Sequence, residues 1–306
     1  MSRPRHSDGA YLRALQVSRF SLFAFVEGKA LDPSFFGQVC SRVCRPRGVL
    51  YQIRTARELP RGSEGKSALI SFCRLARSRG QLTSTLNGKL TVLLFFLDKD
   101  VDDVRRTRCR SRHVVYTAGY DVENYVFQHG DFVTGVSAAA SIDPSELSGH
   151  PSFGRNWRET AARRWKEWIV LCLFSVVYNR GATANYRTAS RVNTPINGPV
   201  DRRLYDARLA EARRSSQLTQ EQFDTAVRRL TGRVDRHLTN GTYDLVFKGK
   251  WYGTLLERDL RDAFPGRGQM QNVGTRATAA LLATLDFNQN WAGHLLRPVE
   301  SLLAQP

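Results

Sequence analysis

The sequence has few cysteines, no long hydrophobic run and too few acidic residues to balance the basic ones. It contains five Cys in 306 residues, and no Cys-x-x-Cys pair, so neither a disulfide framework nor a typical zinc site is expected. The longest apolar run, residues 169–178, is far shorter than the ~20 residues that cross a bilayer. The first residues also lack the apolar segment of a secretory signal. These features predict a cytoplasmic protein with free thiols and no membrane contact.

The shortage of acid leaves a large positive charge. There are 46 Lys and Arg against 28 Asp and Glu, a formal net charge of +18. Hydrophobic residues at 42% are sufficient for a folded core, so the excess charge belongs to a globular protein. Such a surplus favours a nucleic-acid partner. The alternative is a solvated basic surface that reflects codon bias, because only seven of the basic residues are Lys.

Short apolar runs alternate with helix-length segments in the first half of the chain. This order predicts βαβ units and a mainly parallel sheet flanked by helices, the α/β class. The second half has helical periodicity in most segments, and a strand only at residues 243–247. We therefore expect an α/β domain over residues 15–135 and a mostly helical C-terminal region over residues 155–306. The small and polar residues 137–153 are expected to form a connector.

Acidic residues follow two of the predicted strands directly. Glu27 follows the run 21–26, and Asp98 and Asp100 follow the most hydrophobic run, 90–97. In an extended chain, residues two apart point to the same side, so both Asp carboxylates could face one ion. Carboxylate oxygens are the ligands that Mg²⁺ prefers, and the acids therefore predict a metal site at the carboxyl edge of the sheet. The alternative is that they are ordinary turn and cap residues.

An arginine-rich stretch follows these acids closely. It includes Arg105, Arg106 and Arg108, which would suit the phosphate backbone of a nucleic acid beside a metal site. The alternative is a solvated loop.

Three segments together resemble a known domain. They are Phe-Val-Glu-Gly-Lys at residues 25–29, Leu-Leu-Phe-Phe-Leu-Asp-Lys-Asp-Val-Asp-Asp at residues 93–103 and Thr-Ala-Gly-Tyr-Asp-Val-Glu-Asn-Tyr-Val-Phe at residues 117–127. In this order they resemble the TOPRIM domain, in the branch related to the OLD-family nucleases. Within that branch the length and motif order are most similar to the AriB-type nuclease effectors of PARIS anti-phage systems. Residues 247–251, Phe-Lys-Gly-Lys-Trp, carry a weaker similarity.

The resemblance implies roles for particular residues. Glu27, Asp98, Asp100 and Glu123 match catalytic acids that bind Mg²⁺ or Mn²⁺. Lys250 or Lys248 would stabilise the charge of the transition state, and Lys248 would also contact nucleic acid.

One position departs from the family pattern. OLD-type proteins commonly carry an Asp four residues after the Glu, where this chain has Leu31. The nearest acid is Asp32. Because a shift of one residue turns a helical side chain by about 100°, the N-cap of the following helix is the favoured role for Asp32.

The same resemblance implies a metal-dependent endonuclease that cleaves RNA, with tRNA as the expected substrate, and acts as the toxic effector of an antiviral defence system. An ABC-type ATPase partner, AriA-like, would restrain it, and the sequence leaves room for a homodimer. Two alternatives stay open: a general TOPRIM DNA nuclease, and a non-catalytic nucleic-acid-binding or assembly protein.

Overall fold

The computed structural model describes residues 7–60, 64–105, 107–153, 156–178, 183–196 and 198–304, without the side chains of Asp103 and Arg105. The chain forms two compact units. The first comprises residues 1–98, 108–117 and 286–306, and the second comprises residues 99–107 and 118–285.

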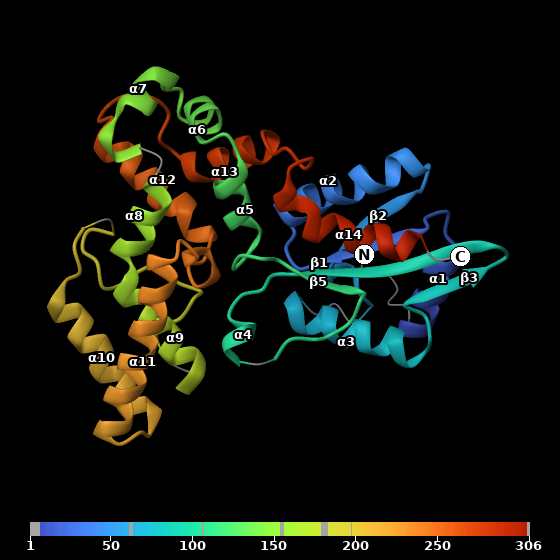
Figure 1. Ribbon diagram of the computed structural model, residues 1–306, viewed down its shortest axis with the longest axis horizontal. Coiled ribbons are helices and arrows are strands. Elements are labelled where there is room, and N and C mark those ends of the chain that lie inside the picture. Colours follow the sequence, from blue (N-terminus) through green and yellow to red (C-terminus); the bar gives the residue numbers. More distant parts are fainter. Residues whose placement is uncertain are drawn as a thin grey trace, which may run out of the picture. The chain divides into compact units, whose positions relative to one another are not determined.

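The first unit contains a five-stranded sheet (Figure 1). Its strands are β1 (Leu22–Val26), β2 (Tyr51–Thr55), β3 (Thr83–Leu86), β4 (Lys89–Leu97) and β5 (Val114–Tyr116). The order is β2-β1-β4-β3, and β5 also pairs with β4. Strands β1, β2, β4 and β5 run parallel, and only β3 is antiparallel. The prediction of a mainly parallel sheet in an α/β fold is confirmed.

The antiparallel strand β3 was not predicted. It joins β4 through a tight hairpin at Asn87 and Gly88, whose φ angles are 50° and 75°. A two-residue hairpin turn that matches the right-handed twist of its strands needs positive φ at both residues. Asn-Gly is the strongest sequence signal for such a turn. The signal was therefore present in the sequence.

Helices cover both faces of this sheet (Figure 1). Helices α2 (Asp32–Cys44) and α14 (Gly293–Leu303), with the 3-10 turn η5 (Asn290–Ala292), lie on one face, and α1 (Asp8–Val17) and α3 (Gly65–Ser78) on the other. Two further 3-10 turns, η1 (Arg45–Arg47) and η2 (Ala56–Glu58), flank β2. Strand β4 is buried on both sides, because Phe95 stacks on Phe25 at 5.0 Å and Phe96 stacks on Phe36 at 4.3 Å between ring centroids.

The second unit is helical throughout its described part, apart from an isolated bridge between Asn193 and Val200. Its helices are α4 (Asp102–Arg105), α5 (Val122–His129), α6 (Phe132–Ala140), α7 (Pro144–Gly149), α8 (Trp157–Arg164), α9 (Lys166–Tyr178), α10 (Arg202–Ser216), α11 (Gln220–Thr239), α12 (Lys250–Ala263) and α13 (Val273–Ala283), with the 3-10 turns η3 (Pro151–Phe153) and η4 (Tyr243–Leu245). The mostly helical C-terminal region is thus confirmed.

Two local expectations are wrong. The expected connector at residues 137–153 consists largely of α6, α7 and η3. Its small residues Ser137, Ala139 and Ala140 are buried in α6, which packs on α13. The expected strand at residues 243–247 is the 3-10 turn η4. The chain there turns into α12 instead of pairing with a sheet.

The two units also divide the chain differently from the predicted ranges 15–135 and 155–306. Helices α5 and α6 pack on α13, which assigns residues 118–135 to the helical unit. Helix α14 packs on α2 and β4, which assigns residues 286–304 to the sheet unit. Both assignments depend on contacts between segments far apart in the sequence.

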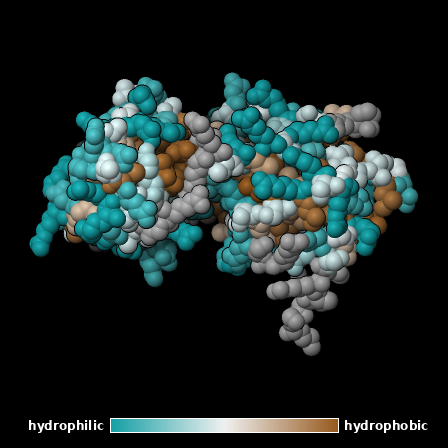
Figure 2. All heavy atoms as spheres, turned by 90° about the horizontal axis from the view of Figure 1, so that it is seen from below, coloured by the Kyte–Doolittle hydropathy of each residue, from teal (hydrophilic) through white to brown (hydrophobic). Residues whose placement is uncertain are grey.

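Among the described helices, none combines the length and apolarity needed to cross a membrane. Helix α9, which carries the longest apolar run of the sequence, has only 13 residues. In Figure 2, hydrophilic side chains cover much of the visible surface of each unit, and hydrophobic ones show between them.

The cysteines differ in their expected reactivity. Cys40, Cys44, Cys73 and Cys172 are buried, whereas Cys109 is half-buried. Burial raises the pKa of Cys44 and Cys73 to about 11, and raises the pKa of Cys40 and Cys172 well above its usual range.

Since the thiolate is the reactive form, we expect one thiol, that of Cys109, to react fast in the native protein and the other four to react only on unfolding. A time course with a chromogenic disulfide reagent, with Cys109→Ser as the control that removes the fast phase, measures this. Two or more fast thiols would contradict it.

Candidate active site

Glu27 and Asp98 lie together at the carboxyl ends of two neighbouring parallel strands. Phe25 of β1 is opposite Phe95 of β4, so the chain segments that follow both strands emerge at the same edge. Oε1 of Glu27 accepts a hydrogen bond from the backbone N–H of Asp98 at 2.8 Å. Asp98 is only 7% exposed. The adjacency expected from the sequence is therefore present for these two acids.

A tight turn holds Glu27 in place. The backbone N–H of Gly28 donates to Oδ2 of Asp32 at 2.6 Å, and a Cβ on Gly28 would lie 2.7 Å from Oδ1 of the same carboxylate. Only glycine leaves room for this approach. Asp32 is the first residue of α2 and Leu31 occupies the N-cap position, so the expected N-cap role of Asp32 is wrong. Its carboxylate instead fixes the turn that carries Glu27, and its charge suits the helix N-terminus.

Asp100 does not continue an extended chain. Strand β4 ends at Leu97, and Asp100 has a φ of 47°, in the left-handed region that Asp tolerates better than most residues. Its backbone N–H donates to the carbonyl oxygen of Tyr120 at 2.7 Å. The argument that Asp98 and Asp100 face one ion because they are two apart in a strand is therefore wrong. The chain passes from the first unit to the second between Asp98 and Lys99.

A second pair of acids begins helix α5 in the second unit. Asp121 occupies the N-cap position and Glu123 lies in the first turn, and they are 1% and 8% exposed. Burial raises the pKa of Asp121 strongly, Glu123 and Asp100 raise it further, and Lys250 and Lys248 oppose the rise. Within the described part of the chain, the buried Oδ1 of Asp121 has no hydrogen-bond partner. The structure thus places Asp100, Glu123 and both lysines around Asp121.

Asp121 was not among the predicted site residues. The sequence did carry a signal, because Asp121 and Glu123 are two residues apart, as Asp98 and Asp100 are, and follow the short apolar run 113–117 after three intervening residues. An acidic residue just before a helix is equally typical of an ordinary N-cap, so the sequence alone did not identify Asp121 as a site residue.

Lys248, Gly249 and Lys250 lie against the start of α5. A Cβ on Gly249 would overlap the Asp121 carboxylate and lie 2.8 Å from the backbone carbon of Glu123. Nζ of Lys250 is 4.0 Å from Oε1 of Glu123. Nζ of Lys248 donates to the carbonyl oxygen of Tyr186 at 2.9 Å, which holds this side chain against the protein itself.

Replacing Gly249 by Ala is expected to destabilise the protein by about 1–3 kcal/mol, because the new methyl group meets backbone and a buried carboxylate. Gly232, in the interior of α11, is a matched control since a Cβ there meets no atom within 4 Å. Gly232→Ala is expected to stabilise by up to about 1 kcal/mol. Chemical denaturation of both variants measures this, and equal effects would contradict the close approach at Gly249.

Asp244 organises the surroundings of this second pair. Its Oδ1 accepts hydrogen bonds from Nδ2 of Asn124 and from the hydroxyl of Tyr252, both at 2.8 Å. Its Oδ2 is 2.7 Å from Nη1 of Arg158, and its carbonyl oxygen accepts the N–H of Tyr120 at 2.7 Å. The Asp244 carboxylate therefore connects α5, α8 and α12, and its backbone carbonyl adds the segment before α5.

The arginine predictions have different outcomes. The side chain of Arg105 and the whole of Arg106 lie outside the described residues. Arg108 is exposed in the first unit, with its guanidinium carbon 5.1 Å from the centroid of the Tyr116 ring. A role of these residues and of Lys248 in nucleic-acid binding stays a prediction.

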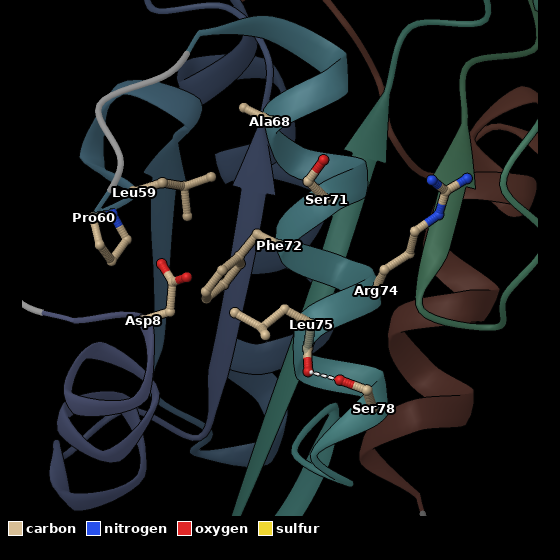
Figure 3. Close-up of a pocket in the computed structure, with 9 residues that line it drawn as sticks. All are labelled: Asp8, Leu59, Pro60, Ala68, Ser71, Phe72, Arg74, Leu75 and Ser78. Carbon is tan, nitrogen blue, oxygen red and sulfur yellow. Dashed lines mark hydrogen bonds between the residues drawn. The ribbon is translucent and has the colours of Figure 1, made fainter.

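The first unit also contains a mainly apolar hollow between the start of α1, Pro60 and α3 (Figure 3). Its volume is about 420 Å³, and Leu59, Phe72 and Leu75 point toward one another inside it. Asp8 supplies a carboxylate at its edge. None of the predicted site residues lines this hollow.

In the described part of the chain, no group of three or more His, Cys, Asp or Glu is arranged to hold a metal ion by protein ligands alone. Two acidic residues lie together in the first unit, where the Glu27 carboxylate meets the backbone N–H of Asp98, and two in the second, Asp121 and Glu123. Mg²⁺ commonly binds through one or two carboxylates and takes its other ligands from water and substrate phosphates. A pair of acids with one buried carboxylate oxygen that has no hydrogen-bond partner, as at Asp121, fits such an ion.

No protein-family profile, no curated protein and no solved structure matches the chain.

Proposed function

We propose that the protein is a Mg²⁺- or Mn²⁺-dependent endonuclease of the TOPRIM type, related to the OLD-family nucleases. The observation that carries the proposal is the hydrogen bond from the Asp98 backbone to Glu27 at 2.8 Å, which joins two acids at the carboxyl ends of adjacent parallel strands. Ligand sites of parallel sheets gather at this edge. The net charge of +18 suits a polyanionic substrate.

The acids and lysines have separate tasks in this proposal. Glu27 and Asp98 provide oxygen ligands, and we propose the same for Asp100 and Glu123. When bound, Mg²⁺ or Mn²⁺ would polarise the scissile phosphate and lower the pKa of a bound water. Lys250 has a half-exposed ammonium group 4.0 Å from Glu123, which lets it offset acidic charge and meet negative charge that develops on the phosphate.

RNA, and tRNA in particular, is the substrate that the resemblance favours. The same resemblance supports a role as toxic effector of antiviral defence in the cytoplasm, held inactive by an AriA-like ABC-type ATPase. A nuclease that acts on host RNA needs such restraint. The general DNA nuclease and the non-catalytic binding protein are the competing functions.

Purified protein incubated with labelled tRNA, single-stranded RNA and plasmid DNA separates these functions. We expect cleavage of tRNA with Mg²⁺ or Mn²⁺ and none with EDTA. Cleavage of DNA alone would support the general DNA nuclease, and binding without cleavage would support the non-catalytic protein. Expression alone should arrest growth, and co-expression with the ATPase should relieve the arrest.

A further inference from the structure

A groove in the first unit runs between residues 108–116 and helix α14. Its volume is about 640 Å³, within the range of about 300–1,000 Å³ typical of ligand sites. Arg108 and Arg112 line it from the loop before β5, and Arg297 lines it from α14. We call this the basic groove. None of the described residues that line it is acidic, so the three arginines give the lining a positive charge.

The protein holds the arginines of the loop in position. Nε of Arg112 donates to Nε2 of His113 at 3.4 Å, and Nδ1 of His113 is 2.8 Å from the carbonyl oxygen of Leu93. Burial lowers the pKa of His113, so the neutral ring donates through Nδ1 to Leu93 and accepts from Arg112 through Nε2. The ring of Tyr116 lies against Arg108, and its hydroxyl accepts the N–H of Cys109 at 2.9 Å. These contacts fix both ends of the loop to the sheet.

The third arginine is held by its own helix. Nε of Arg297 donates to the carbonyl oxygen of Gly293 at 3.1 Å. Within the described part of the chain, neither Arg112 nor Arg297 forms an ion pair with an acidic side chain. A guanidinium has five N–H donors, so each of these two keeps its terminal amino groups for a ligand.

The residues that line the basic groove indicate which kind of ligand it can bind. Guanidinium groups bind phosphate oxygens in a bidentate manner, and the hydroxyls of Ser111 and Ser301 add neutral donors. Val114 and Leu302 supply apolar surface that can contact a sugar or a base. Several cations along a concave, partly apolar wall fit a chain of phosphodiesters better than the flat surface of an anionic membrane.

We propose that the basic groove binds the phosphodiester backbone of a nucleic acid, with RNA as its ligand. Only the identity of RNA as the ligand rests on the proposed nuclease function. The groove brings together Arg108 and Arg297, which are almost 200 positions apart in the sequence. It therefore adds Arg297 of α14 to the arginine-rich stretch, a neighbour that the sequence pattern does not indicate.

Binding of fluorescein-labelled single-stranded RNA, measured by anisotropy with EDTA present so that no cleavage occurs, tests the proposal. The variant is Arg112→Ala with Arg297→Ala. The control is Arg258→Ala with Arg261→Ala, which removes the same charge from two arginines paired with acids of their own helix. We expect the groove variant to bind at least about tenfold more weakly. Its log–log salt slope should fall by about 1.4, or about 0.7 per lost phosphate contact.

Equal affinity and equal salt slope in the groove variant and the control would overturn the proposal. Loss of binding to phosphatidylserine vesicles or to pyrophosphate, with RNA binding retained, would also overturn it, in favour of a lipid or small-anion site. If no metal activates cleavage but the groove variant still binds RNA more weakly than the control, the proposed nuclease function is wrong and the proposed RNA-binding role of the groove is supported.

Discussion

Glu27→Gln and Asp98→Asn are each expected to lower metal-dependent cleavage by at least about 100-fold. Gln keeps an oxygen that can accept the N–H of Asp98, so the turn and the strand ends should retain their shape while the charge is lost. Removing one of two adjacent carboxylates also relieves their repulsion in the absence of metal, and we expect no loss of thermal stability. Single-turnover cleavage rates over a series of Mg²⁺ concentrations measure the effect.

Glu64→Gln is a matched control in the same unit. Its carboxylate is 61% exposed and pairs with Arg57 at the surface. It should retain wild-type rates at every metal concentration. Full activity in both Glu27→Gln and Asp98→Asn would rule out the proposed centre.

Asp244→Ala is expected to destabilise the protein by about 3–5 kcal/mol, because it leaves a largely buried guanidinium without its partner. Arg158 and Asp244 are 2.7 Å apart, with side chains 21% and 12% exposed. Burial lowers the pKa of Arg158, but the carboxylate of Asp244, together with Tyr252 and Tyr243, raises it overall. Asn124 and Tyr252 lose their acceptor in the same variant. Urea denaturation followed by circular dichroism measures the loss.

Glu146→Ala removes an ion pair of a different kind in the same unit. Glu146 and Arg267 are 3.0 Å apart, but their side chains are 40% and 62% exposed. Solvent screening limits such a pair to about 0–1 kcal/mol. If the two variants lost similar stability, the role assigned to Asp244 would be wrong.

The sheet and one half of the acidic site could be predicted because their signals are local. The run 90–97 is apolar at every position except Thr91, which marks a strand buried on both faces, and an acid directly after such a strand falls at the sheet edge. Glu27 and Asp98 were therefore placed correctly beside each other. The orientation of Asp100 could not be predicted in this way. Asp100 itself has a positive φ, so the extended chain, in which residues two apart point to the same side, does not continue to this residue.

The division into units could not be predicted either, because long-range packing decides it. Helix α14 has an amphipathic pattern that would fit a helical domain equally well, with Leu295, Val299 and Leu302 on its buried side. Nothing in that pattern says whether the partner is another helix or a sheet. Likewise, no sequence signal links Asp244 to Asn124, which is 120 residues away.

The location of α14 has a consequence for the order of events during translation. Leu295 and Val299 are fully buried, and Phe287 contacts Phe35 of α2 at 5.4 Å between ring centroids. Glu27 and Asp98 leave the ribosome early, yet the apolar layer on one face of their sheet remains incomplete until residues 286–304 have been synthesised. A nascent chain therefore carries both acids before it has a finished sheet unit, and a polypeptide that ended before residue 286 would lack Phe287, which covers Phe35 of α2.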